Sequence, residues 1–249
     1  MCRPRARDRV REPRGTLLQI PRSADRSPRS ALAALRRDSY GRCMHEHLPD
    51  DFDWNDIYSG EESDFMPPDP LVLELASELG PGDVLDVGCG AGGLLAALAA
   101  RGWGLHGVDV APKAIEAAKK VLGSRGVRAE LVVGNAATWT PSRTHDLVTN
   151  CFALPLTRAE QIEVYRMIRE AVAPGGTVIL KDFDSGMAGI GAFGGVDLVE
   201  VEHLLDAFDG FEVLRAEVVP TPVHDHGAGT YGEMTWTAAL LVARRPLAG

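Results

Sequence analysis

A glycine-rich stretch between a predicted strand and a predicted helix constrains this chain more than any other feature. The stretch is Gly88-x-Gly90-x-x-Gly93; an apolar strand is predicted before it at residues 83–87 and an Ala/Leu-rich helix after it at 92–101. Glycines let the backbone approach a ligand closely, and the free N–H groups of a helix start bind polar groups. The spacing is typical of nucleotide-type ligands but does not choose among them.

Short apolar strands alternate with helices along the rest of the chain. Further strands are predicted at 105–110, 129–133, 146–149, 177–180, 211–219 and 235–243. Strands separated by helices form βαβ units, which build a parallel, doubly wound α/β sheet. The last two strands are joined by a loop alone, so the last strand is expected to be antiparallel. We therefore expect a Rossmann-like seven-stranded sheet, mostly parallel with an antiparallel last strand.

The first 43 residues differ in composition from the rest of the chain. They contain 12 Arg and 4 acidic residues within a total net charge of −9, which leaves −17 on residues 44–249. They contain so few apolar residues that burying them would not offset the conformational entropy lost on folding. We expect a disordered Arg-rich tail at 1–43, which under one interpretation precedes a native start at Met44, and one domain at 44–249.

The composition of residues 44–249 limits the partners and the compartment. A strongly acidic domain repels nucleic acid, so we expect no nucleic-acid partner. Four widely spaced cysteines, with no metal-ligand spacing, favour a reducing cytoplasm and no metal site. No apolar run approaches the roughly 18 residues that a membrane helix needs, so no membrane partner is expected. The sequence does not indicate the oligomeric state.

Two carboxylates help to identify the ligand of the glycine loop. Asp86 lies two residues before Gly88 at the end of its predicted strand, and Asp109 ends the next predicted strand. A carboxylate at Asp86 would repel a pyrophosphate but suits the sulfonium and ammonium groups of S-adenosylmethionine. Asp109 can accept hydrogen bonds from ribose hydroxyls, which NAD and S-adenosylmethionine share. The residues therefore favour S-adenosylmethionine, with NAD as the alternative.

Three motifs together resemble the class I S-adenosylmethionine-dependent methyltransferases. They are the glycine-loop region beginning VLDVGCGAGG (84–120), HDLVTNCFAL (145–154) and VAPGGTVILKDF (172–183), and the resemblance spans about residues 53–245. The general pattern looks most like the small-molecule branch of the class. The motif at 145–154 lacks the N-P-P-[YF] signature of many enzymes that methylate nucleic acids and proteins.

The resemblance implies a set of cofactor-binding residues. Asp86, Gly88 and Gly90 would hold the methionine end, Asp109 the ribose, and Val110, Asn135 and Ala136 the adenine. An aromatic W-x-x-x-Y segment folds over the cofactor in related enzymes, although here it has the alternative of packing against the sheet edge. The full expected cofactor-binding set is Trp54, Tyr58, Asp86, Gly88, Cys89, Gly90, Asp109, Val110, Asn135, Ala136, Cys151 and Phe152.

The acceptor is expected at the carboxyl ends of the strands, where open parallel sheets bind ligands. A loop at 220–234 returns to this rim and carries His224, Asp225 and His226. His224 and His226 are the candidate catalytic residues, as a general base, and the alternatives are a metal pair or a solvated loop.

The sequence as a whole predicts an enzyme that transfers a methyl group from S-adenosylmethionine to an O, N or S atom of a small molecule. The transfer is an in-line displacement that depends mainly on positioning. Two alternatives stay open: an NAD-dependent oxidoreductase, and a non-catalytic S-adenosylmethionine-binding regulatory protein.

Overall fold

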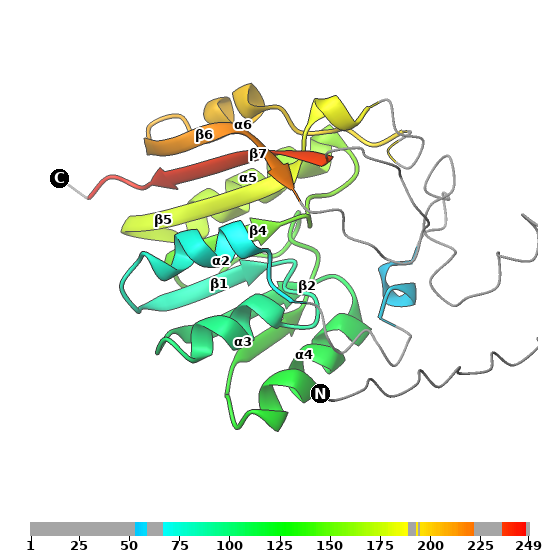
Figure 1. Ribbon diagram of the computed structural model, residues 1–249, viewed down its shortest axis with the longest axis vertical. Helices are drawn as coiled ribbons and strands as arrows, with labels where there is room; N and C mark the ends of the chain where they lie inside the picture. Colours follow the sequence, from blue (N-terminus) through cyan, green and yellow to red (C-terminus); the bar gives the residue numbers. More distant parts are fainter. Residues whose placement is uncertain (1–52, 59–66, 189–192, 194, 222–235, 248–249) are drawn as a thin grey trace, which may run out of the picture. The chain divides into compact units, whose positions relative to one another are not determined.

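The computed structural model describes residues 53–58, 67–188, 193, 195–221 and 236–247, all within one compact unit, Ser39–Gly249. The predicted tail at 1–43 and the histidine loop at 222–235 lie outside the described residues. Figure 1 shows a single central sheet with helices on both faces. The three-layer α/β arrangement expected from the alternating pattern is therefore confirmed.

The sheet has seven strands in the order β3-β2-β1-β4-β5-β7-β6 (Figure 1). Strands β1 to β5 run parallel, and β7 pairs antiparallel with both β5 and β6. The antiparallel last strand is confirmed. The strands are β1 Asp83–Val87, β2 Gly104–Asp109, β3 Glu130–Val133, β4 His145–Cys151, β5 Val172–Phe183, β6 Glu212–Thr221 and β7 Trp236–Arg244.

The α-helices form two layers, each with its own apolar core. One core joins the sheet to α2, α3 and α4, and the other joins it to α5 and α6. The predicted core residues Leu94, Leu98, Ile115 and Val164 are all buried. The helices are α2 Pro70–Ser77, α3 Gly93–Ala99, α4 Pro112–Ser124, α5 Arg158–Ala171 and α6 Val201–Ala207, with short 3-10 turns η1 Trp54–Asp56 and η3 Ser185–Met187.

Local signals explain where several elements begin. Thr157 caps α5 by accepting from the Glu160 N–H and donating to the Glu160 carboxylate. Its Thr-x-x-Glu spacing predicts a helix start here, but as a capping box in which Glu160 would bond the backbone N–H of Thr157. The sequence also predicts a turn at Pro174-Gly175-Gly176, whereas β5 begins at Val172 and runs through these residues. It does so because the chain beyond β7 pairs there: Gly175 donates to Arg245 O at 2.9 Å.

The helical spacing of apolar residues in the sequence predicts that Ile162 and Leu205 are buried, and the structure places both outside the core. Ile162 in α5 and Leu205 in α6 are exposed, at 50% and 37% of their surface. Each helix buries a narrower stripe than the periodicity suggests, since only one face of each reaches the sheet.

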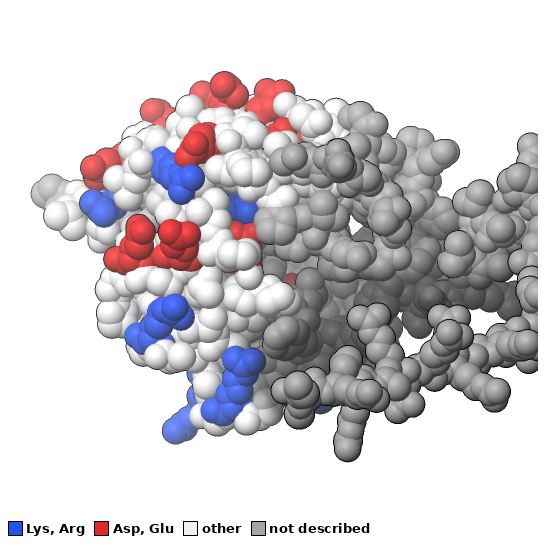
Figure 2. Space-filling view, viewed as in Figure 1, with Lys and Arg blue, Asp and Glu red and all other residues white. Residues whose placement is uncertain are grey.

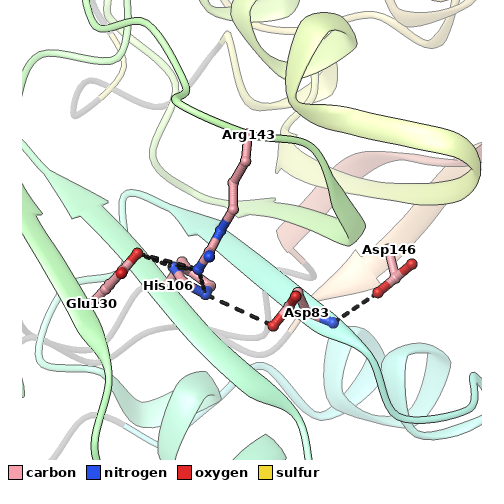
Figure 3. A network of polar contacts seen from close by, with 5 residues as sticks. All are labelled: Asp83, His106, Glu130, Arg143 and Asp146. Atoms are coloured by element: carbon pink, nitrogen blue, oxygen red, sulfur yellow. Dashed lines mark hydrogen bonds and ion pairs between the residues drawn. The ribbon is translucent and has the colours of Figure 1, made fainter.

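A polar network lies at the amino ends of the strands, opposite the end where ligands bind in this architecture (Figure 3). His106 on β2 contacts the Glu130 carboxylate at 2.8 Å, and Asp146 accepts from the backbone N–H of Asp83 at 2.9 Å. Burial and then the neighbouring Arg143 lower the pKa of His106, which therefore stays neutral at pH 7. These contacts tie together the starts of four neighbouring strands.

Figure 2 shows acidic side chains toward α6 and β6 and again over α2, with basic side chains beside them in the upper part of the face. Toward α3 and α4 the charged side chains in view are mainly basic. No helix among the described residues is long and apolar enough to cross a membrane.

Candidate functional site

A cavity of about 500 Å³ opens at the carboxyl ends of β1, β2 and β4. Its wall comes from the glycine loop, the end of β2, the chain after β3, the chain after β4 and the segment before α2. All twelve residues expected to bind the cofactor line this one cavity. The structure thus brings the twelve together, and their individual roles stay predictions.

The glycine loop passes close to its neighbours at the cavity floor. Gly88 has φ +74° and Gly90 has φ +51°, a left-handed region that side chains with a Cβ rarely adopt. A Cβ on Gly88 would collide with the Cβ of Ala153, and one on Gly90 would lie 2.8 Å from the Tyr58 hydroxyl. Both the backbone conformation and the space therefore require glycine here.

Asp86 is a buried carboxylate at the end of β1. Its side chain accepts a hydrogen bond from the Thr149 hydroxyl at 2.7 Å, and the residue is only 5% exposed. Burial raises the pKa of Asp86 to about 7, which the Thr149 bond opposes and nearby Asp109 increases. Because its pKa lies near 7, the Asp86 carboxyl is partly protonated at neutral pH. A cationic ligand bound beside it would favour the ionised carboxylate.

Asp109 links the end of β2 to the glycine loop. One carboxylate oxygen accepts from the Gly90 N–H and the other from the Ala111 N–H, each at 2.9 Å. Burial raises the pKa of Asp109, and these two backbone bonds oppose the rise. Each carboxylate oxygen has further lone pairs, so Asp109 can still accept hydrogen bonds from a ligand.

The candidate adenine residues follow β2 and β3. Val110 lines the cavity with 48% of its surface exposed, and Ala136 lies beside it in the wall. The Asn135 amide oxygen already accepts from the Ala137 N–H at 2.9 Å. Only its remaining lone pair is available, so a contact to an adenine amino group would be weaker than one from a carboxylate.

The aromatic segment Trp54–Tyr58 lies at the cavity and not only at the sheet edge. Asn55 accepts from the Lys113 N–H at 3.0 Å, which anchors η1 to the start of α4. Trp54, Ile57 and Tyr58 line the cavity. Burial, followed by nearby Asp109, raises the pKa of the Tyr58 phenol, which favours the protonated hydroxyl and so a group able to donate a hydrogen bond. This placement is the one expected of a cover over the glycine loop.

The two cysteines in the wall are poor nucleophiles. Burial is the main cause that raises the pKa of both thiols, Cys89 and Cys151, well above the usual value. The thiolate is the reactive form, so both are expected to be inert packing residues.

Three features in and around the site were not predicted from the sequence: the pairing of Asp69, the contact that Asp182 makes and the backbone conformation of Phe152. Asp69 caps α2, lines the cavity and pairs with buried Lys181, and its position before Pro70 at a helix start is a visible N-cap signal. Asp182 accepts from the Leu154 N–H at 3.0 Å and so holds the chain after β4 in place. Phe152 has φ +52°, a strained conformation in the cavity wall that no sequence pattern predicts.

The candidate catalytic residues His224 and His226 fall outside the described residues. Their placement at the rim stays a prediction, as does their role as a general base.

Comparisons with known proteins agree with this geometry. Residues 84–176 match the family model described as "Methyltransferase domain". The chain is 37% identical over 70 residues to the ribosomal RNA small subunit methyltransferase C of Alcanivorax borkumensis, covering 28% of this chain and 22% of that protein. It is 29% identical over 157 residues to the ubiquinone biosynthesis O-methyltransferase of Aliivibrio fischeri, covering 62% of this chain and 60% of that protein.

The fold has close counterparts among solved structures. The N-methyltransferase NodS from Bradyrhizobium japonicum, solved with S-adenosyl-L-homocysteine, superposes with a TM-score of 0.56 at 18% identity, covering 71% of this chain and 83% of that one. The chain spans between about a fifth and three fifths of the length of the curated relatives named above. Residues 84–176 therefore match a methyltransferase domain, and the described chain has the class I, Rossmann-like methyltransferase fold.

Proposed function

We propose that the protein transfers a methyl group from S-adenosylmethionine to an O, N or S atom of a small-molecule acceptor. One observation carries the proposal: Asp86, the glycine loop and Asp109 converge on a single cavity at the carboxyl ends of the strands. The methyltransferase family match over residues 84–176 supports it and disfavours the NAD-dependent alternative.

The residues present fit the proposed cofactor. Gly88 and Gly90 leave open the space that a Cβ would fill, and Asp86 offers a buried carboxylate to a cation. A pyrophosphate at the same place would face that carboxylate and lose free energy by repulsion. The donor set thus matches a sulfonium-bearing nucleoside better than a dinucleotide.

When bound, S-adenosylmethionine supplies an electrophilic methyl group on a sulfonium sulfur. The chain's own residues would position the cofactor and the acceptor and would exclude water from the cavity. Asp86 and Asp109 would orient the methionine and ribose ends from the floor of the cavity, and Trp54 and Tyr58 would cover it. A protein that holds the acceptor atom in line with the methyl group and the sulfur replaces the random encounter of two molecules in water. This positioning is the main source of rate acceleration for such a displacement.

The acceptor class is the less constrained part of the proposal. The Aliivibrio relative is named for ubiquinone biosynthesis, which favours a small molecule, whereas the Alcanivorax relative is named for ribosomal RNA. The match to the small-molecule enzyme covers more of this chain, and residues 44–249 are acidic, which disfavours a polyanionic nucleic acid.

Calorimetry with S-adenosylhomocysteine and with NADH tests the cofactor. We expect S-adenosylhomocysteine to bind and NADH not to bind; the reverse result would exclude a methyltransferase. A metabolite panel scored for S-adenosylhomocysteine release then tests catalysis. Cofactor binding without release from any acceptor would favour the non-catalytic regulatory protein.

A further inference from the structure

The chain that follows β4 forms an apolar wall on the acceptor side of the cavity. We call Phe152, Ala153, Leu154, Pro155 and Leu156 the acceptor wall, and all five line the cavity. The wall follows directly from the end of β4, beside the ends of β1 and β5. A molecule that reaches the cofactor's methyl group from this side would contact mainly carbon.

The charged residues that line the cavity are all acidic. They are Asp69, Asp86, Asp109 and Glu160, and no described lining residue is Lys, Arg or His. Beyond residues 1–52, the segments outside the described part of the chain also contain no Lys or Arg. No Lys or Arg of residues 53–249 therefore lines the cavity as described, and His224 and His226 lie outside the described residues.

Lys181 is a buried cation near the acceptor wall, and its charge is already matched. Lys181 is 1% exposed, and its Nζ donates to Asp69 Oδ2 at 2.7 Å and to Thr221 Oγ1 at 3.1 Å. Nζ also lies 5.2 Å from the ring centroid of Phe152. The Asp69 carboxylate compensates the charge of Lys181, and these contacts hold the ammonium group in place. Lys181 is therefore a poor partner for an anionic ligand.

An anionic group would enter this cavity at a net cost. It would lose its hydration, meet no Lys, Arg or His side chain among the described lining residues and approach carboxylates of the same sign. An uncharged group would lose little hydration and gain contact with the apolar wall. The two kinds of acceptor thus differ in the sign of their interaction with the same residues.

We propose that the acceptor is an uncharged, apolar molecule, and that the acceptor wall together with the neutralised Lys181–Asp69 pair excludes acceptors bearing a carboxylate or phosphate. The inference rests on the proposed function, since it names the acceptor class for that same site.

A matched pair of fluorescent probes measures this preference without knowledge of the natural acceptor. N-phenylnaphthylamine is uncharged, and anilinonaphthalene sulfonate adds a sulfonate to the same ring system. Both are titrated into the full-length protein saturated with S-adenosylhomocysteine. We expect the uncharged probe to bind at least about tenfold more tightly. Tighter binding of the sulfonate, equal binding, or no binding of either probe would overturn the proposal.

A substitution in the acceptor wall locates the effect. Leu156 is partly exposed, so Leu156→Arg places a cation in the wall without filling a closed core, and Leu156→Met is the uncharged control. Leu156→Arg is expected to reduce the preference for the uncharged probe by about tenfold, and Leu156→Met to leave it within about twofold. If Leu156→Arg leaves both affinities unchanged, the probes bind elsewhere and the acceptor wall does not set the preference.

Turnover gives a second and separate readout. Acceptors are offered as pairs that differ only by an ester in place of a carboxylate, and S-adenosylhomocysteine release is measured. Faster methylation of the carboxylate members would contradict the charge rule while leaving methyl transfer intact. Failure of S-adenosylhomocysteine to bind would instead contradict the proposed function, and the probe pair on the cofactor-free protein would still measure the preference of the cavity.

Discussion

The Asp109 carboxylate accepts a hydrogen bond from the backbone N–H of Gly90 at 2.9 Å, across 19 residues of sequence. The bond fixes the glycine loop to the end of β2 and leaves the carboxylate in the cavity wall. Shape of the loop and charge of the site thus depend on the same side chain.

Replacing this carboxylate should weaken cofactor binding more than folding. For Asp109→Ala we expect affinity for S-adenosylhomocysteine to fall about ten- to hundredfold, because the hydrogen bonds that the ligand would donate to the charged carboxylate are lost. Asp109→Asn keeps one acceptor oxygen and should lose less. Calorimetry measures the affinities and denaturant unfolding provides the control; an Asp109→Ala variant that binds normally would remove Asp109 from the site.

Gly90→Ala tests the close approach of the loop. The new Cβ would meet the Tyr58 hydroxyl at 2.8 Å and require a strained left-handed backbone, so binding should weaken by about tenfold or more. Gly126→Ala is the matched control: Gly126 also has a left-handed φ, +68°, but open space around it, and it does not line the cavity. Gly126→Ala should lower the free energy of unfolding and leave affinity unchanged. Equal losses of affinity in the two variants would point to general destabilisation.

Binding of S-adenosylmethionine should depend on pH through Asp86. In the free protein burial raises the pKa of this carboxyl to about 7, and a neighbouring cation favours its ionised form. Binding therefore releases a proton below the free-state pKa, and affinity should fall as pH drops below about 7, by up to about tenfold per unit. At higher pH the affinity should level off.

Asp86→Asn is the control for this pH dependence. The amide cannot titrate, so its affinity should be lower at neutral pH and nearly flat between about pH 5.5 and 8. Calorimetry in buffers of different ionisation enthalpy counts the protons released. A wild-type affinity that does not change across this range would show that Asp86 does not face the cationic end of the cofactor.

Replacing the histidines of the loop should change the rate of methyl transfer but not cofactor binding. If His224 or His226 acts as a general base, its replacement by Ala should lower kcat by about a hundredfold or more for an acceptor that must lose a proton. S-adenosylhomocysteine affinity should not change. Single-turnover methylation of an acceptor found in the panel provides the measurement, and wild-type kcat in both variants would assign the loop no role in proton transfer.

Much of the fold could be read from local pattern. Thr157 with Glu160 marks the start of α5, the glycines after Val87 mark a tight strand-to-helix loop, and the absence of a helix between β6 and β7 implies their antiparallel pairing. These signals work because helix caps, left-handed turns and strand connections depend on residues close together in sequence. The class of the fold and the position of the cofactor loop follow from them.

Details of burial did not follow from local pattern. Ile162 and Leu205 keep the helical spacing of core residues yet remain exposed, because the width of the buried stripe depends on which helices and strands are opposite. β5 also extends past its Pro-Gly-Gly sequence because the chain after β7 supplies partners there.

The sequence by itself determined the class I fold, the glycine loop and the two carboxylates that flank it, since each of these is encoded within a few neighbouring residues. Only the tertiary structure decided which distant groups meet in the cavity wall. Lys181 and Asp69 are 112 residues apart, and their pairing matches the charge of a buried cation near the acceptor wall. Such a contact depends on how α2 packs against β5, and the sequence carries no local signal of that packing.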